Sequence, residues 1–487
     1  MRVASRCGVY LGWLLWWHRQ RRGRKKEPER LSPACPCLRQ APPGGPPPVA
    51  IGPPSQIQQA QPSPLEDILL ERGVITTDDW IRIKAEEEKR AELAGAEIGI
   101  LSSPRWYERI RVMGYIQTRY ALLDNPMMDI PLSDRLATTD PNTFYIRRIR
   151  MVFMGQISDR LAFYFQPAYE GTQQALSNLE VVDAFADFFI TKDKEHRIRF
   201  GQQRVLNSFD TLRSSSNRLE LDRHESIQSG APGERDLGVA YYWSPKISQL
   251  RYAQLATYHN GPGDYGDFGI MVYNGQTRNR PELNYDKHVS LRLAHPFELP
   301  DGRLLETGLF AYRGQFVVDP GTRSRCPVAL HVQDGGTTGC QVLDERLTWY
   351  LWTPPQPSWG LLAEYTVGRG PERDSQGFIR ESALYGGYVQ PYYTWRTLPI
   401  GLLTTYVRYG EYYGGIKTIN GVNGRSTTIN LGLVWEPDTH WRFVAEWEYK
   451  EGLHSSLIRP GVPLTSTVPQ AEFTGNLFRF QAQWFWN

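Results

Sequence analysis

Polar and apolar residues alternate with a period of two through most of the chain after residue 109. In residues 473–487, the aromatic residues Phe478, Phe480, Trp484 and Trp486 share one parity, while arginine and glutamine occupy the other. Such alternation is typical of a β-strand with one apolar and one polar face. A row of exposed aromatics is an aggregation hazard in water, but the lipid-facing side of a membrane barrel requires it. The pattern therefore predicts a strand that faces lipid.

The preceding segment, residues 440–450, repeats this pattern. Trp441 and Trp447 lie on the apolar parity, and Glu446 and Glu448 lie on the polar parity. In a barrel the polar parity faces the lumen. We therefore expect these tryptophans in a lipid-facing aromatic girdle, and these glutamates as negative charges in the lumen.

Turn signals divide the region after residue 109 into segments of strand length. The expected strands are 109–121, 143–157, 161–170, 180–191, 196–205, 234–244, 250–259, 268–274, 285–295, 303–317, 344–353, 359–368, 383–395, 400–413, 426–436, 440–450 and 473–487. This makes seventeen strands, or sixteen if 250–259 and 268–274 are one interrupted strand. An even number is expected for a closed bacterial barrel, so we predict sixteen.

The connections between the expected strands alternate in length. Tight turns are expected at 158–160, 192–195, 244–246 and 437–439, and long loops at 122–142, 206–233, 318–343 and 451–472. Short turns on one rim and long loops on the other are the pattern of outer-membrane barrels. The predicted fold class is therefore all-β, an antiparallel transmembrane β-barrel, preceded by a short helical N-terminal module.

The composition supports a barrel over a bundle of membrane helices. Aromatic residues make up 12% of the chain, yet the mean hydropathy of -0.47 is hydrophilic. A helical membrane protein would contain several apolar runs of 18 or more residues, and this sequence has none. A hydrophilic average with many aromatics fits a barrel, because only alternate residues meet lipid.

The first 100 residues differ from the rest and predict three regions before the barrel. Residues 1–40 hold ten basic and two acidic residues around a short apolar run, which we interpret as an atypical signal or an incorrectly assigned start. Residues 41–64 are rich in Pro, Gly and Gln and predict a disordered linker. Residues 65–100 predict a short helical periplasmic module or a solvated tether, and residues 101–487 the barrel.

Arginine dominates the positive charge of the barrel region, which is neutral overall with 40 basic and 40 acidic residues. This balance gives no support to nucleic-acid binding. Five of these arginines lie on the lumen parity of expected strands, as do two aspartates: Arg148, Arg150, Arg197, Arg199, Arg292, Asp183 and Asp187.

Four further arginines lie in or next to the long loop 206–233: Arg204, Arg213, Arg218 and Arg223. The sequence leaves open whether this loop or 318–343 folds into the lumen; we expect 206–233, because it holds these arginines close to the arginine-bearing strands. Two interpretations of the lumen arginines stay open. They pair with Asp183, Asp187, Glu446 and Glu448 and brace the barrel, or they attract anions, since guanidinium groups match phosphate and carboxylate oxygens.

An ordered set of short motifs is more specific than the alternation. The set comprises Phe144–Arg150, Arg197–Gln202, Asn207–Arg223, Arg235–Val239, Tyr273–Gln276 and Arg292–Pro296. In this order they resemble the phosphate-selective porin O/P family of outer-membrane proteins over roughly residues 105–487. The resemblance implies a sixteen-stranded, usually trimeric barrel that conducts small anions. It also implies an arginine ladder, for which Arg148, Arg150, Arg197 and Arg199 are the candidates, and a lysine cluster that this lysine-poor region does not match.

Cys326 and Cys340 are the two cysteines of the barrel region. They either form a disulfide in an oxidising compartment or stay unpaired. Their spacing without further ligands is poor evidence for zinc, so neither a metal nor another cofactor is expected.

Two other classes of protein were weighed against a channel. An enzyme is disfavoured because the chain has no G-x-S-x-G, H-E-x-x-H, Walker or dinucleotide-binding motif. A secreted glycan-binding β-protein is disfavoured because the aromatics cluster on the lipid parity and near strand ends, where membrane girdles lie. The sequence thus predicts a non-enzymatic porin in the outer membrane of a Gram-negative-type bacterium. We expect a preference for phosphate or other small anions, with outer-membrane lipid and two further copies of the chain as partners. A non-selective or sugar-selective porin is the alternative.

Overall fold

The computed structural model describes residues 109–124, 142–170, 179–318, 325–334, 337–374, 376–417, 422–455 and 470–486. The regions expected at 1–40, 41–64 and 65–100 lie outside these residues. The signal, the linker and the helical module therefore stay predictions.

Strands make up most of the described chain. They are β1 (Ile110–Leu123), β2 (Asn142–Ser158), β3 (Leu161–Glu170), β4 (Leu179–Phe189), β5 (His196–Arg204), β6 (Arg235–Trp243), β7 (Phe268–Tyr273), β8 (His288–Glu298), β9 (Leu304–Val318), β10 (His331–Asp334), β11 (Thr337–Thr353), β12 (Trp359–Arg373), β13 (Ile379–Trp395), β14 (Leu402–Ile416), β15 (Val422–Glu436), β16 (Trp441–Ser455) and β17 (Gln470–Trp486). Every strand except β10 coincides with an expected one.

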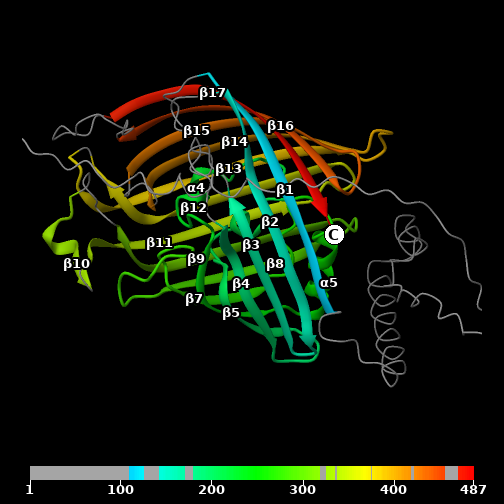
Figure 1. Ribbon diagram of the computed structural model, residues 1–487, viewed down its shortest axis with the longest axis horizontal. Helices are drawn as coiled ribbons and strands as arrows, with labels where there is room; N and C mark the ends of the chain where they lie inside the picture. Colours follow the sequence, from blue (N-terminus) through cyan, green and yellow to red (C-terminus); the bar gives the residue numbers. More distant parts are fainter. Residues whose placement is uncertain are drawn as a thin grey trace, which may run out of the picture. The chain divides into compact units, whose positions relative to one another are not determined.

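The strands close into a sixteen-stranded antiparallel barrel (Figure 1). Each strand pairs with its neighbours along the chain, except that β9 pairs directly with β11. The last strand returns to the first, with Gly114 opposite Trp486 and Leu123 opposite Leu477. The short strand β10 forms a hairpin with β11 and adds no strand to the closed circuit.

Four helical segments lie in the described connections: α3 (Phe209–Leu212), α4 (Glu225–Gln228), α5 (Lys246–Leu255) and the 3-10 turn η2 (Val328–Leu330). The strand expected at 250–259 is wrong, because α5 takes up most of it. Its buried residues Ser248, Tyr252 and Leu255 follow a helical spacing, which its short run of alternation concealed. No helix among the described residues is long and apolar enough to cross a membrane.

The two faces of the wall follow the predicted parity. On β8, Val289 and Leu293 are 43% and 47% exposed on the outside, while His288 and Arg292 are fully buried on the inside. A charge on the lipid-facing side would cost about 2–4 kcal/mol near the midplane for Arg or Lys. The parity of charged residues therefore determines which face of each strand is turned inward.

One rim has the short turns that were predicted, with one exception, whereas the opposite rim also has a short connection between β12 and β13. The rim that holds the 159–160, 190–195, 299–303 and 437–440 connections has short turns, and we call it the short-turn rim. The tight turn expected at 244–246 is wrong, because residues 244–267 form a long connection on this rim and contain α5. The connection 205–234 starts from the opposite rim.

Candidate functional site

Residues 205–234, which we call the lumen loop, fold into the barrel, as predicted for 206–233. The loop reaches the wall on the far side: Leu221 N donates to Glu446 Oε2 at 3.2 Å, and Arg408 Nη1 donates to Asp222 O at 2.8 Å. Helix α4 of the loop contacts β12, β13 and β14. The lumen loop therefore spans the interior.

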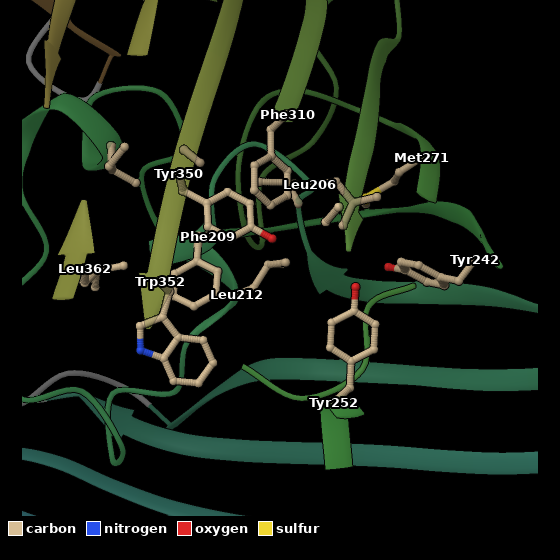
Figure 2. Close-up of a cluster of buried hydrophobic side chains, with 14 of the residues drawn as sticks. Leu206, Phe209, Leu212, Tyr242, Tyr252, Met271, Phe310, Tyr350, Trp352 and Leu362 are labelled. Carbon is tan, nitrogen blue, oxygen red and sulfur yellow. The ribbon is translucent and has the colours of Figure 1, made fainter. Parts of the chain in front are cut away.

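Apolar side chains hold the start of the lumen loop against β11. Phe209 lies with its ring centroid 4.6 Å from that of Tyr350 and 5.4 Å from that of Trp352. Leu206 and Leu212 belong to the same buried cluster (Figure 2). Aromatic pairs at such separations add about 0.5–1.5 kcal/mol each beyond their burial. The loop thus carries its own apolar core into the lumen.

The first turn of α3 is anchored to the wall by a carboxylate. Glu364 on β12 accepts hydrogen bonds from Phe209 N at 2.8 Å and Asp210 N at 3.2 Å. Ser208 Oγ accepts a further one from Thr211 N at 3.0 Å. These bonds satisfy backbone donors that a helix start otherwise leaves unpaired.

Arg213 lies fully buried in the lumen loop and neutralises two carboxylates. Its Nη2 donates to Asp210 Oδ1 at 2.7 Å and to Glu220 Oε1 at 2.5 Å. Burial by itself raises the pKa of Glu220, but the charges of Arg213 and Arg408 outweigh it and lower that pKa to about 2. Arg213 therefore stabilises the loop, and its charge is already compensated.

Arg479 on β17 links the far wall to the lumen loop. It forms ion pairs with Asp222 of the loop, with Glu446 and, at 2.9 Å, with Glu448. Arg119 on β1 also contacts Asp222, at 3.2 Å. Glu446 and Glu448 do lie on the inner face, but their common partner is Arg479 rather than any of the nine arginines that we singled out.

Ion pairs also run along the near wall. Arg199 binds Asp187 through two hydrogen bonds of 2.7 and 2.8 Å, as the bracing interpretation requires. Asp183 instead pairs with Arg235 at 3.1 Å, the first residue of β6. Each aspartate therefore lies beside a guanidinium, that of the adjacent strand β5 for Asp187 and that of β6, one strand further, for Asp183.

Three more of the predicted arginines pair with glutamates outside the predicted set. Arg150 and Arg148 both contact Glu170 at the end of β3, Arg148 at 3.4 Å. Arg292 on β8 donates to Glu306 on β9 at 2.8 Å, and both side chains are fully buried.

Two arginines near the lumen loop have looser or shared partners. Arg223 contacts Glu234, and its Nε lies 3.3 Å from Asp210 Oδ1. Arg197 donates to the backbone oxygen of Asp264, whose carboxylate lies 3.9 Å away. The side chain of Arg197 keeps 12% of its surface exposed.

Arg204 and Arg218 differ from the other seven, because neither forms an ion pair with a carboxylate among the described residues. Arg204 is half-buried and donates to Leu212 O. Arg218 is buried and donates to Leu221 O at 3.4 Å, while its Nε and Nη1 have no hydrogen-bond partner. Among the predicted set, these two guanidiniums are the ones without a carboxylate in direct contact in the described part of the chain.

Solvent reaches the lumen mainly along one side of the wall. Tyr164 on β3, Phe185 on β4 and Arg197 on β5 are half-buried, and so are Ser214–Asn217 of the lumen loop. On the other side, lumen-facing groups such as Gln390 are fully buried beneath the loop. The accessible part of the interior thus lies between β3–β5 and the lumen loop, next to Arg204.

Sequence reasoning missed several lumen residues that carry the ion-pair network. Arg479 lies on the polar parity already noted for its strand, and Glu364 lies on the buried parity of β12, so alternation could have marked both as site residues. Arg235 has the parity of the outward-facing Leu237 and Val239, so alternation could not have identified it. Glu170 and Glu220 lie at a strand end and in a loop, where alternation provides no signal.

The remaining predicted residues lie as follows. Cys326 and Cys340 form a disulfide in the structure. Trp441, Phe478, Phe480 and Trp484 are between 40% and 53% exposed on the outer face. Two other aromatic residues of the same parity are half-buried: Trp447 and Trp486. The described residues contain no group of three or more His, Cys, Asp or Glu side chains placed to hold a metal ion.

Comparison with family models gives one match in this chain. Residues 128–331, less than half of the chain, match the family described as phosphate-selective porin O and P. The match runs from the loop before β2 to the start of β10, so it includes the lumen loop and most of the predicted arginines. No curated protein matches the sequence.

Several solved structures are similar to this chain. OmpT, an outer membrane protein of Vibrio cholerae in its trimer form, covers 77% of this chain and 99% of its own at 12% identity and a TM-score of 0.43. The outer membrane channel DcaP of Acinetobacter baumannii covers 77% of this chain and 97% of its own, at 12% identity and a TM-score of 0.45. An anion-selective porin from Comamonas acidovorans covers 77% of this chain and 99% of its own, at 10% identity and a TM-score of 0.46.

Proposed function

We propose that the protein is an outer-membrane porin that conducts small anions in preference to cations, which the barrel fold and the match of residues 128–331 to the family described as phosphate-selective porin O and P support. The family and the barrel fold indicate a channel rather than an enzyme. The solutes are phosphate or other small oxyanions that diffuse passively through the barrel.

The proposal rests on which charged side chains in the lumen lack an ion-pair partner and on how exposed each of them is. Arg204 is half-buried beside the accessible part of the interior and has no carboxylate partner among the described residues. Among the described residues, the lumen carboxylates Glu364 and Asp236 have no ion-pair partner; they are 1% and 3% exposed and accept backbone N–H groups instead. The charge that a solute meets there is therefore positive.

Arginine suits this task through its shape as well as its charge. The planar guanidinium presents parallel N–H donors that match the oxygens of phosphate or carboxylate. Rings or rows of arginine at a constriction favour anions by attraction at close range. Arg204 supplies such a guanidinium on the accessible side, with buried Arg218 adding its positive potential, while Arg197 at the other end of β5 contacts Asp264.

We further propose that three copies of the barrel assemble into a homotrimer, as the family resemblance implies. Chemical cross-linking of the detergent-extracted protein should give a ladder that ends at three chains. A ladder that ends at one chain would contradict the trimer and leave the channel function unaffected.

The test of anion binding is a phosphate titration of the chloride current through the purified protein in a planar bilayer. Added phosphate should reduce the chloride current in the wild type, and less strongly in Arg204→Gln. Equal chloride currents with and without phosphate would contradict an oxyanion site and favour a non-selective diffusion pore.

A further inference from the structure

Residues 244–267, which we call the turn insert, enter the barrel from the short-turn rim and meet the lumen loop. Asn217 of the lumen loop donates from Nδ2 to Tyr258 O at 3.3 Å and to Gly261 O at 3.2 Å. In return, Asn260 N donates to Asn217 O at 3.1 Å. Segments from opposite rims are thus joined inside the lumen.

Asn260 has the most contacts with the loop of any residue in the turn insert. Its side chain is fully buried, and its Oδ1 accepts hydrogen bonds from Arg213 Nη1 and, at 3.3 Å, from Leu219 N. Its backbone has a φ of +70°, a conformation that asparagine, aspartate and glycine adopt more readily than other residues. A single amide oxygen therefore contacts both ends of the segment 213–219.

The turn insert is itself fixed to the barrel. His259 Nε2 lies 2.7 Å from Glu436 Oε2 on β15, and Gln356 Nε2 donates to Tyr258 Oη at 3.1 Å. Asp267 Oδ2 lies 2.8 Å from His295 Nδ1 on β8, and α5 also contacts β8. Asn260 thus projects from a braced support rather than from a free loop.

We infer that Asn260 is a positioning residue, which holds segment 213–219 of the lumen loop at a set distance from β3–β5. The inference rests on the proposed channel function, since Ser214–Asn217 border the accessible part of the lumen. The cross-section open to solutes is then determined from both rims. The turn insert acts through the lumen loop and also borders the accessible part at Asp264, beside Arg197.

Loss of the Asn260 side chain should release the loop without unfolding the barrel. A hydrogen bond to a charged group is worth about 1.5–3 kcal/mol, so losing the one from Arg213 raises the released population about tenfold or more. Asn260→Gly keeps the backbone conformation and removes the oxygen. Asn260→Asp keeps an acceptor oxygen and tolerates the same backbone.

The first experiment records single channels of wild type, Asn260→Gly and Asn260→Asp in planar bilayers. We expect Asn260→Gly to spend about tenfold more time in sub-conductance states than the wild type, and Asn260→Asp to behave like the wild type. The control is Asn279→Gly, which removes an exposed asparagine at a φ of +57° outside the lumen contact. Wild-type gating in Asn260→Gly would overturn the inference.

The second experiment is limited trypsin digestion of the folded trimer or barrel in detergent. Cleavage after Arg213 or Arg218 should occur in Asn260→Gly and be absent in the wild type and in Asn260→Asp. Asn217→Ala removes the contact from the loop side and should give the same cleavage, even if Asn260→Gly does not fold. Protection in both variants would overturn the inference. A wild type that conducts no ions, with cleavage as expected, would contradict the channel function and leave the positioning role standing.

Discussion

Arg199 and Asp187 lie directly opposite each other on β5 and β4 and form a two-fold hydrogen-bonded ion pair, with distances of 2.7 and 2.8 Å. The guanidinium carbon of Arg199 also lies 3.9 Å from the ring centroid of Phe185. The pair neutralises an arginine that would otherwise face the accessible lumen. Anion preference therefore depends on which arginines lack such partners, more than on the number of arginines.

Asp187→Asn should make the channel more anion-selective and less stable. The substitution leaves the charge of Arg199 without its partner. Breaking a buried ion pair lowers the free energy of unfolding by about 3–5 kcal/mol at most, and we expect less here because both side chains keep some exposure. Reversal potentials and urea unfolding measure the two effects. The control Asp301→Asn removes an exposed carboxylate at a turn. An unchanged reversal potential in Asp187→Asn would argue against this electrostatic account.

Arg204→Gln should weaken the anion preference, whereas Arg204→Lys should keep most of it. Both variants lose the planar guanidinium, but lysine retains the positive charge beside the accessible lumen. Reversal potentials in a salt gradient distinguish them, with Arg303→Gln at an exposed turn as the control. If the lysine and glutamine variants shift equally, charge at this position does not determine selectivity.

Arg479→Met should destabilise the barrel strongly. It leaves Asp222, Glu446 and Glu448 without their common cation, and such a change in a buried network costs about 3–5 kcal/mol. The shift from folded to unfolded mobility on gels of samples heated stepwise reports the change. Phe480→Leu on the same strand keeps the outer face apolar and should melt close to the wild type. Equal melting of the two variants would refute the bracing role of Arg479.

The free-energy cost of a charge on the lipid-facing side should depend on its depth in the bilayer, which two positions on β15 can test. Leu431→Arg places a charge on the outer face of β15 and should cost about 2–4 kcal/mol if that position lies near the bilayer midplane. Thr427→Arg, four residues nearer the long-loop rim, lies between Glu411 and Glu451 in the sheet register and should cost about 0–1 kcal/mol. Urea unfolding in lipid vesicles measures both. A Thr427 variant as unstable as the Leu431 variant would contradict this placement.

The lumen loop should resist mild acid. The folded pKa of Glu220 is lowered to about 2 from a usual value of 4.5, so its contribution to stability is complete above pH 4.5 and is lost as the pH falls toward 2. Channel noise from loop release should therefore stay low at pH 4 and rise between pH 3 and 2. Glu220→Gln should be noisy already at pH 7. A rise in wild-type noise centred at pH 5 would assign the transition to another group.

Alternation was sufficient to identify the sixteen strands of the barrel, because a lipid-facing row and a lumen row must differ in polarity along every strand. It failed where that contrast is absent. Residues 250–259 lie inside the barrel near its rim and meet no lipid, so a chance alternation there concealed α5. The strand β10 has four residues, which is too short for any periodic signal.

The sequence allowed the residue types of the candidate site to be predicted, but mostly not which of these residues pair with one another. Parity placed Arg199 and Asp187 on the inner face, and their strands are adjacent in sequence, which made their pairing foreseeable. The contacts of Arg479 with Asp222 and of Asn260 with Arg213 join segments far apart along the chain. Those pairings depend on how deeply the lumen loop and the turn insert enter the barrel, which no local pattern encodes.

The measurement that tests the account most directly is the reversal potential of the purified wild-type protein in a planar bilayer under a potassium chloride gradient. Arg204 and Arg218, which form no direct ion pair among the described residues, predict a reversal potential on the chloride side. The preference should shrink in Arg204→Gln. A potential near zero or on the potassium side would contradict anion preference and leave a general outer-membrane porin.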